Sequence, residues 1–135
     1  DHLHHENKRI LFANHCNTQE LIERAQAILT VNSTVGIESL MLGKPVLVLG
    51  NACYDIEGVT HAVRSEEAML QAFNSLEHIY WDYEVKSGFL NFLHDHYVIP
   101  TTWKNIDDKH ITALTQRLNR QDVLSQYLSD YQRPA

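Results

Sequence analysis

The sequence has little of what membrane, secreted or nucleic-acid-binding proteins require. No apolar run approaches the roughly 20 residues that a membrane-spanning helix needs. There are only two cysteines, Cys16 and Cys53, at no metal-ligand spacing, and no secretion-signal pattern is recognisable, so we expect reduced thiols in a cytosolic protein. Positive charge is also scarce: 11 Lys and Arg against 17 Asp and Glu give a net charge of −6, which argues against nucleic acid as a main partner.

What remains is an ordinary globular composition, 44% hydrophobic and 21% charged. The 135 residues suit a single domain with a proper core and are too few for two. The chain opens with Asp1 rather than Met, so we expect it to be part of a longer protein. Within the single domain (1–135) we expect a disordered lead-in over residues 1–7, an α/β core over 8–76 and a helical C-terminal part over 77–135.

Short apolar runs in the first half of the chain alternate with segments of helical character. The predicted strands cover residues 10–13, 27–31 and 45–49, with a further short strand near 59–63. Around them we predict one helix capped by Asn17 or Thr18, a second over 36–42 that ends at Gly43, and a third opened by Ser65. Continuously apolar strands separated by helices are typical of a Rossmann-like α/β fold, with a parallel sheet and helices on both faces.

The last third of the chain is rich in aromatic residues and has apolar residues at helical spacing. We predict helices over 82–96, 107–119 and 121–131, with a break around Pro100. The aromatic side chains could form a lipid-binding or partner-binding surface, but the helical spacing favours packing in the core. They are Tyr80, Trp81, Tyr83, Phe89, Phe92, Tyr97 and Trp103.

Residues 32–36 follow the predicted strand 27–31 and open the next helix. In open α/β sheets, ligands bind beyond the carboxyl ends of the strands, where helix N-termini favour anions. Ser33 and Thr34 add two hydroxyl donors, and Gly36 lets a ligand approach the backbone closely. This arrangement predicts a phosphate-binding loop. A Ser or Thr that only caps the helix, with no ligand, remains the alternative.

Glu38 is the acidic residue of the helix that this loop opens. A capping box needs a Glu three residues after the cap, whereas Glu38 comes four after Thr34 and five after Ser33. It also stands among apolar residues, where a solvated Glu is not expected. We therefore interpret Glu38 as an acceptor for ribose hydroxyls, with a Glu that complements the helix dipole as the alternative.

Three short motifs lie close together around the loop: residues 30–40 (TVNSTVGIESL), residues 43–46 (GKPV) and the spaced pattern Gly50-x-x-x-Tyr54-x-x-x-Gly58-Val59-Thr60. Together they resemble the capsular polysaccharide biosynthesis family, which includes the bacterial Kdo transferases. The resemblance covers roughly residues 21–63. It implies the C-terminal, donor-binding half of a GT-B fold, an arrangement of two Rossmann-like domains.

The resemblance assigns roles to individual residues. Ser33 and Thr34 match the element that contacts the phosphate of a CMP-sugar, and Glu38 matches an acidic position near the ribose. The nucleotide-sugar-binding residues that it implies are Asn32, Ser33, Thr34, Gly36, Glu38, Tyr54 and Thr60. The family's His-Pro element is absent from this sequence, as is the acceptor-binding half with its acidic residues, so the catalytic residues stay unknown.

The resemblance favours CMP-Kdo as the donor in a glycosyltransferase of capsule or surface polysaccharide synthesis. It also implies a glycolipid or polysaccharide acceptor, a missing acceptor-binding domain, and a cytoplasmic location that could include the inner face of the inner membrane. No cofactor is implied, and we expect the chain by itself to be inactive. Two alternatives stay open: another nucleotide-sugar enzyme, such as a UDP-sugar epimerase or transferase, and a non-catalytic binding or assembly domain.

The remaining polar candidates are better explained as structural or solvated groups. A metal site at His2, His4 and His5 would need a rigid frame and more ligands, and a mobile terminus is favoured. Asp55 and Glu57, the other acids near the predicted site, are interpreted as solvated loop charges. Asp107 and Asp108 are interpreted as charges at a helix start rather than as paired catalytic carboxylates.

Overall fold

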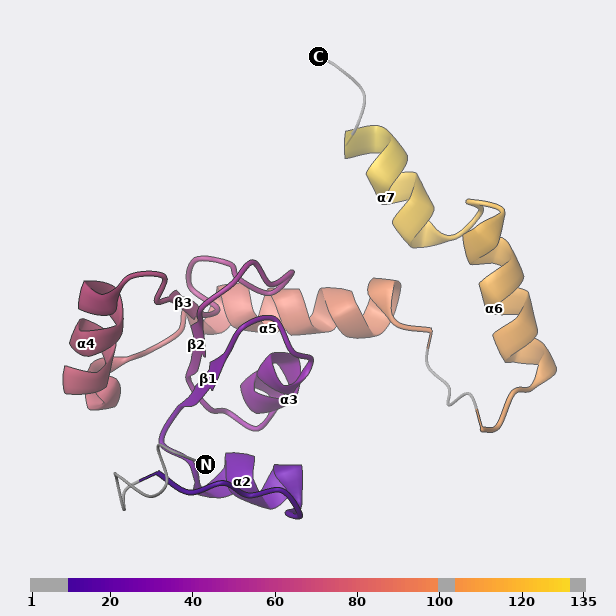
Figure 1. Cartoon of the computed structure of the whole chain (residues 1–135). Coiled ribbons are helices and arrows are strands. Elements are labelled where there is room, and N and C mark those ends of the chain that lie inside the picture. The colour runs from indigo at the N-terminus through magenta and orange to yellow at the C-terminus, as the bar shows by residue number, and fades with distance from the viewer. Residues whose placement is uncertain (1–9, 100–103, 132–135) are drawn as a thin grey trace. The chain divides into compact units, whose positions relative to one another are not determined.

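A computed structural model describes residues 10–99 and 104–131 of the chain. These residues belong to two compact units, Asp1–Asp82 and Tyr83–Ala135. The first unit carries a β-sheet with its helices, and the second is helical (Figure 1). The predicted lead-in over residues 1–7 and the predicted break at Pro100 lie outside the described residues.

Within the described residues, the sheet of the first unit has three short parallel strands in the order β1-β2-β3. They are β1 (Ile28–Thr30), β2 (Val46–Val48) and β3 (His61–Ala62). β1 pairs with β2 so that Ile28 lies opposite Val46, and β2 pairs with β3 so that Leu47 lies opposite His61. The predicted α/β class, with its parallel sheet, and the last three of the predicted strands are thus confirmed.

The described residues of this unit form three α-helices, and their ends match the capping residues that the sequence predicted. They are α2 (Thr18–Arg24), α3 (Val35–Met41) and α4 (Glu66–Asn74), and a short 3₁₀ turn, η1 (Leu76–His78), follows α4. The Asn17 side chain caps α2 by accepting hydrogen bonds from two backbone N–H groups, and the Ser65 hydroxyl caps α4 by accepting one. Gly43 follows α3 with a φ of 71°, a conformation that glycine adopts without strain.

The first predicted strand, over residues 10–13, is wrong. These residues form no strand, and Leu11 and Phe12 are 79% and 50% exposed. An apolar run forms a strand only where a neighbouring strand satisfies its backbone hydrogen bonds. Within the described residues β1 pairs with β2 alone, so the short run at 10–13 has no ladder to stabilise it.

The core of the first unit surrounds the central strand β2. All three residues of β2 are fully buried, because a strand flanks it on each side and apolar side chains cover its faces. The other buried apolar side chains come from α2, α3 and the segment 54–63. They are Ile22, Leu40, Tyr54, Val59 and Val63. This small core fixes the ends of the strands, and with them the loops that follow.

The second unit contains the helices that the sequence predicted in the last third of the chain. α5 (Tyr83–Phe92) continues into a π-helical turn, η2 (Leu93–Tyr97), and α6 (Asp108–Leu118) and α7 (Val123–Tyr131) follow. Asp107 caps α6, since its side chain accepts a hydrogen bond of 2.8 Å from the His110 N–H group. The interpretation of Asp107 as a charge at a helix start is confirmed.

The prediction that the aromatic residues pack in a core is wrong for several of them. The exposed side chains are those of Tyr80, Tyr83, Phe92 and Tyr97. Trp81 and Phe89 are half-buried, and Trp103 lies outside the described residues. Helical spacing places side chains on one face of a helix, but it does not supply an element that covers that face.

An arginine links the helices of the second unit. Arg117 donates hydrogen bonds to the carbonyl oxygens of His96 (2.7 Å) and Tyr97 (3.0 Å) in η2, and it forms an ion pair with Asp122. Burial alone would raise the pKa of the Asp122 carboxyl, but hydrogen bonds from Ser125 and Arg117 outweigh this effect and hold the pKa below its usual value. The turn between α6 and α7 is thus tied to the end of η2.

Candidate functional site

The loops that carry most of the residues singled out by the sequence lie at one end of the sheet. Because all three strands are parallel, the loops that follow them leave the sheet at the same, carboxyl end. The N–H group of Gly50 donates to the carbonyl oxygen of Val31 (3.2 Å), just beyond the ends of β2 and β1. The N–H group of Val63 likewise donates to the carbonyl oxygen of Val48 (2.8 Å). The three chain segments that leave the sheet here therefore start side by side.

The β1–α3 loop, residues 31–34, exposes polar side chains at this end of the sheet. Asn32, Ser33 and Thr34 are all exposed. The Ser33 hydroxyl accepts a hydrogen bond of 3.3 Å from the Val35 N–H group at the start of α3, which is a capping role. Thr34 is the N-cap residue by position, but its hydroxyl forms no capping hydrogen bond. The capping alternative therefore accounts for Ser33 and does not account for Thr34.

Tyr54 is buried beneath this loop, with only 1% of its surface exposed. Its hydroxyl donates a hydrogen bond of 2.5 Å to the carbonyl oxygen of Ser33, and burial raises the pKa of the phenol. Its ring packs against Gly36, where a Cβ atom would lie 2.5–2.6 Å from three atoms of the tyrosine. The space that glycine leaves at this position is thus filled by a side chain of the protein itself.

Thr60 is a second buried residue of the predicted site. Its hydroxyl donates to the carbonyl oxygen of Tyr54 (3.2 Å) and lies 3.4 Å from the Asp55 carboxylate. It thereby holds the backbone of the loop that follows β2. The residues implied by the resemblance accordingly fall into an exposed group and a buried group. The exposed residues are Asn32, Ser33, Thr34 and Glu38, and the buried ones are Gly36, Tyr54 and Thr60.

Glu38 lies on the outer side of α3 and is exposed. The buried residues of this helix are Gly36, Ser39 and Leu40, which share one face, and Glu38 falls outside that face. It lines a shallow depression of about 230 Å³ whose other walls come from α2 and the end of α3. The expectation that Glu38 is not solvated is therefore wrong, because a helix that buries one face leaves room for a charge within an apolar stretch.

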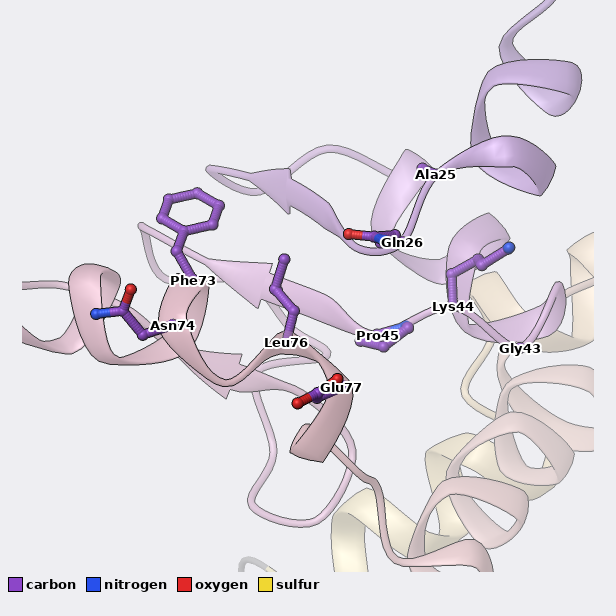
Figure 2. A pocket seen from close by; sticks show the side chains of 9 residues that line it. All are labelled: Ala25, Gln26, Gly43, Lys44, Pro45, Phe73, Asn74, Leu76 and Glu77. Carbon is purple, nitrogen blue, oxygen red and sulfur yellow. The ribbon is translucent and has the colours of Figure 1, made fainter.

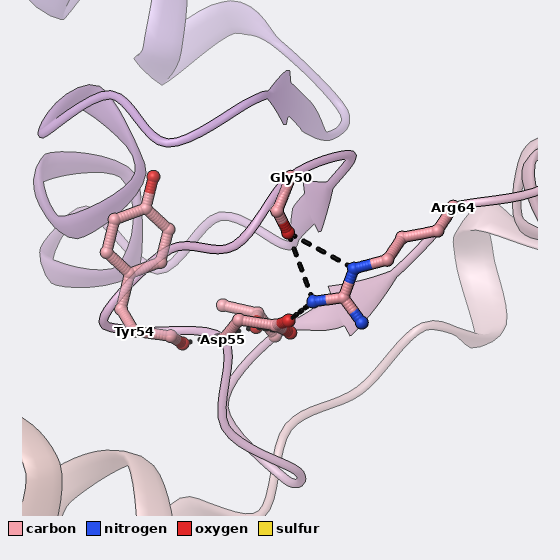
Figure 3. A network of polar contacts seen from close by, with 5 residues as sticks. Gly50, Tyr54, Asp55 and Arg64 are labelled. Carbon is pink, nitrogen blue, oxygen red and sulfur yellow. Dashed lines mark hydrogen bonds and ion pairs between the residues drawn. The ribbon is translucent and has the colours of Figure 1, made fainter.

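An arginine that the sequence analysis missed also reaches this end of the sheet (Figure 3). Arg64 follows β3 closely, and its Nε and Nη2 atoms donate hydrogen bonds of 3.2 and 3.0 Å to the carbonyl oxygen of Gly50. The signal that could have found Arg64 is its position. It is a basic residue directly behind a predicted strand, at the end of the sheet where ligands bind.

Arg64 also forms an ion pair with Asp55, whose side chain is only 15% exposed. The Thr60 hydroxyl approaches the same carboxylate. The interpretation of Asp55 as a solvated loop charge is therefore wrong, because two neighbouring side chains bind it. Glu57, in contrast, is exposed as expected.

A cavity of about 660 Å³ opens at the opposite, amino end of the sheet (Figure 2). Its walls include Gly43, Lys44 and Pro45, just before β2, together with Phe73 of α4 and Leu76 of η1. Ligands of open α/β sheets bind at the carboxyl ends of the strands. The size of this cavity therefore does not make it the ligand site, and the β1–α3 loop remains the better candidate.

The part of the chain that the structure describes holds no group of three or more His, Cys, Asp or Glu side chains placed to bind a metal ion. His2 and His4 lie outside that part, and Cys16 and Cys53 are free thiols. Among the helices within residues 10–99 and 104–131, none is long and apolar enough to cross a membrane.

Comparisons with known proteins match this chain to one family and to curated relatives. A family model described as "Capsule polysaccharide biosynthesis protein" matches residues 1–91, which include the whole first unit. Protein FixF of Sinorhizobium fredii is 41% identical over 111 residues, which are 82% of this chain and 26% of FixF. The capsule polysaccharide export protein KpsS of Escherichia coli is 46% identical over 54 residues, which are 40% of this chain and 14% of KpsS. The chain thus spans about a quarter or less of these relatives. No solved structure matches it.

Proposed function

The chain belongs to the capsule polysaccharide biosynthesis family, and from this premise we propose that its first unit is the donor-binding half of a glycosyltransferase that builds capsule or surface polysaccharide. The donor is a nucleotide sugar, and the resemblance of residues 30–60 favours a CMP-sugar such as CMP-Kdo. The acceptor, a glycolipid or polysaccharide, binds a further domain outside this chain. The enzyme works in the cytoplasm, at the inner face of the inner membrane.

One observation carries this proposal: the adjacent residues Ser33 and Thr34 are exposed at the carboxyl end of a parallel sheet. Donor groups between a strand and a helix bind the phosphates of nucleotides in many α/β proteins. α3 is only seven residues long, so the hydroxyl and amide groups of the loop, rather than the dipole of a long helix, would hold the phosphate. The Tyr54 hydroxyl fixes the Ser33 carbonyl, which keeps these donors in place before a ligand binds.

The predicted residues have different roles in this proposal. Asn32, Ser33 and Thr34 contact the donor phosphate directly, and Glu38 accepts hydrogen bonds from the ribose hydroxyls. The residues that position the loop are Gly36, Tyr54 and Thr60. Holding the phosphate orients the sugar and stabilises the nucleotide as a leaving group. The carboxylate for acid–base or nucleophilic chemistry comes from the rest of the enzyme.

Calorimetry with CMP tests the proposal. Replacing Ser33 and Thr34 together by Ala should weaken CMP binding by about 1–3 kcal/mol, the scale of losing hydrogen bonds to a charged group. A matched control removes two exposed hydroxyls from α6, with Thr112 and Thr115 replaced by Ala, and should leave the affinity unchanged. Unchanged CMP affinity in a folded Ser33/Thr34 double variant would remove this loop from the site. Tighter binding of UDP than of CMP would favour a UDP-sugar enzyme.

A second candidate function comes from the relative KpsS, which is named an export protein. The first unit would then serve binding or assembly during export, without transferring a sugar, since one fold supports different functions. Nucleotide binding separates the two candidates. A folded chain that binds neither CMP nor UDP nor a nucleotide sugar in the same calorimetry would favour the export role.

A further inference from the structure

Arg64 is a cation at the carboxyl end of the sheet. The described residues 10–82 contain three Lys or Arg side chains. Arg24 and Lys44 precede β1 and β2 and so stand at the amino end, whereas Arg64 follows β3. A guanidinium stabilises a phosphate through several N–H groups in a planar arrangement. Within the described part of the first unit, Arg64 is therefore the cation placed to bind a phosphate beside the β1–α3 loop.

The backbone brings Arg64 close to that loop. Gly50, whose carbonyl oxygen accepts both hydrogen bonds from Arg64, donates its own N–H group to the carbonyl oxygen of Val31 at 3.2 Å. This contact is tight, since a Cβ at Gly50 would lie 2.8 Å from Cγ1 and 2.9 Å from the carbonyl oxygen of Val31. Val31 is the first residue of the loop that carries Ser33. A single residue, Gly50, thus bridges the guanidinium and the β1–α3 loop.

Part of the guanidinium has no hydrogen-bond partner among the described residues. Nε and Nη2 bind Gly50 and Asp55, whereas Nη1 donates no hydrogen bond to any residue that the structure describes. In Figure 3 the third nitrogen of Arg64 points away from both of these partners. The side chain is also 48% exposed. The hydrogen bonds to Gly50 therefore orient the guanidinium and leave one nitrogen available to a ligand.

We propose that Arg64 is a second phosphate-binding residue of this site, and that the donor phosphate competes with Asp55 for its guanidinium. The inference rests on the proposed function, because the ligand it takes is the phosphate of a nucleotide sugar. Arg64 is the half-exposed member of the pair, so a phosphate from solvent can reach its guanidinium, and the Asp55 carboxylate, only 15% exposed, keeps the Thr60 hydroxyl as a hydrogen-bond donor when it gives up Arg64. The hydrogen bonds from Arg64 to Gly50 remain in both states.

Competition gives Arg64 and Asp55 opposite effects on phosphate binding. Arg64→Gln removes the positive charge and should weaken binding about tenfold, the scale of one charge-assisted hydrogen bond. Asp55→Asn removes the competing carboxylate and should strengthen binding severalfold, a gain that a misfolded variant does not produce. Arg64→Lys keeps the charge without the planar fork and should give an intermediate affinity. If Arg64 only held the loops together, Asp55→Asn would break the same ion pair and weaken binding instead.

Nuclear magnetic resonance of the isotope-labelled chain tests this inference. The Nε–H signal of Arg64 and the amide signals of residues 33–36 are followed while inorganic phosphate is added at low ionic strength. Arg24→Gln, which removes the same charge from the amino end, is the control. We expect phosphate to shift both groups of signals, with an affinity lowered in Arg64→Gln, raised in Asp55→Asn and unchanged in Arg24→Gln. Equal affinities of Arg64→Gln and Arg24→Gln, or weaker binding by Asp55→Asn, would overturn the inference.

Parallel titrations with CMP and cytidine separate this inference from the proposed function. CMP binding that needs Ser33 and Thr34 but is indifferent to Arg64 would keep the proposed function and reject the inference. Phosphate binding that follows the predicted pattern for Arg64 and Asp55, with CMP and cytidine binding no more tightly than phosphate, would keep the anion site and reject a nucleotide donor.

Discussion

Replacing Gly36 by alanine tests the packing beneath the β1–α3 loop, because two effects of opposite sign act in this variant. In a helix, alanine is favoured over glycine by about 1 kcal/mol, so the change stabilises α3 wherever space allows. At Gly36 the Tyr54 side chain already occupies the space that a Cβ atom would need. The new Cβ would lie 2.5 Å from Cζ and 2.6 Å from both Cε2 and the hydroxyl oxygen of Tyr54.

The Tyr54 ring cannot move aside without a loss of stability. It is 1% exposed, and its hydroxyl is bonded to the Ser33 carbonyl oxygen. Overpacking a core site typically costs about 1–3 kcal/mol, and breaking the tyrosine hydrogen bond adds about 1 kcal/mol. The gain in helix propensity offsets about 1 kcal/mol of this sum. We therefore expect Gly36→Ala to lower the free energy of unfolding of the first unit by about 1–3 kcal/mol.

Gly88 in α5 provides the matched control, because nothing lies within 4 Å of a Cβ at that position. Gly88→Ala should raise the stability of the second unit by about 0.5–1 kcal/mol. Native-state hydrogen exchange reports on the two units separately, through the amides of β2 and of α5. If Gly36→Ala proves as stable as the parent chain, or more stable, the packing of Tyr54 against α3 is refuted.

Two further predictions concern single carboxylates. Glu38→Gln should weaken binding of CMP more than binding of its analogue without ribose hydroxyls, because only CMP has hydroxyl groups that can donate hydrogen bonds to the carboxylate. Equal losses of affinity for the two ligands in calorimetry would mean that Glu38 is a solvated surface charge. Burial would raise the pKa of Asp122, but hydrogen bonds from Ser125 and Arg117 lower it below its usual value. This lowered pKa predicts that acid destabilises the second unit. This contribution is fully present above the unfolded-state pKa of 3.8 and is lost as pH falls through the lower folded-state pKa. Asp122→Asn should remove that part of the pH dependence of thermal unfolding, and an unaltered pH profile would contradict the assignment.

The range of each interaction decided which elements could be predicted from the sequence. The caps at Asn17, Ser65 and Asp107 were predictable, because capping depends on residues within one helical turn. The absence of a strand over residues 10–13 could not be predicted, because an apolar run forms a strand only with a partner elsewhere in the chain. The prediction of core packing for the aromatic residues of the second unit was wrong for the same reason. Helical spacing places side chains on one face of a helix but does not show which element covers that face.

The same distinction applies within the candidate site. The β1–α3 loop was predictable, because a polar pair between an apolar strand and a helix is a local pattern. The hydrogen bond from Tyr54 to Ser33 spans 21 positions in the sequence, and that from Arg64 to Gly50 spans 14. Both depend on which loops meet at the carboxyl end of the sheet. A motif could associate Tyr54 with the predicted site, but only the packing shows it beneath the loop.

Under the proposed function, an exposed loop held by a buried tyrosine explains how a unit with a small core would present a defined binding surface. Ordering a free loop on binding would cost about 1–2 kcal/mol per residue, which would be subtracted from the affinity for a donor. Here the bond from Tyr54 to Ser33 and the bond from Gly50 to Val31 order the loop before any ligand binds. It follows that changes at the supporting residues should lower donor affinity by loosening the loop, without removing a ligand contact. A change at Thr34, whose hydroxyl makes no capping bond, should remove a contact and leave the loop as it is.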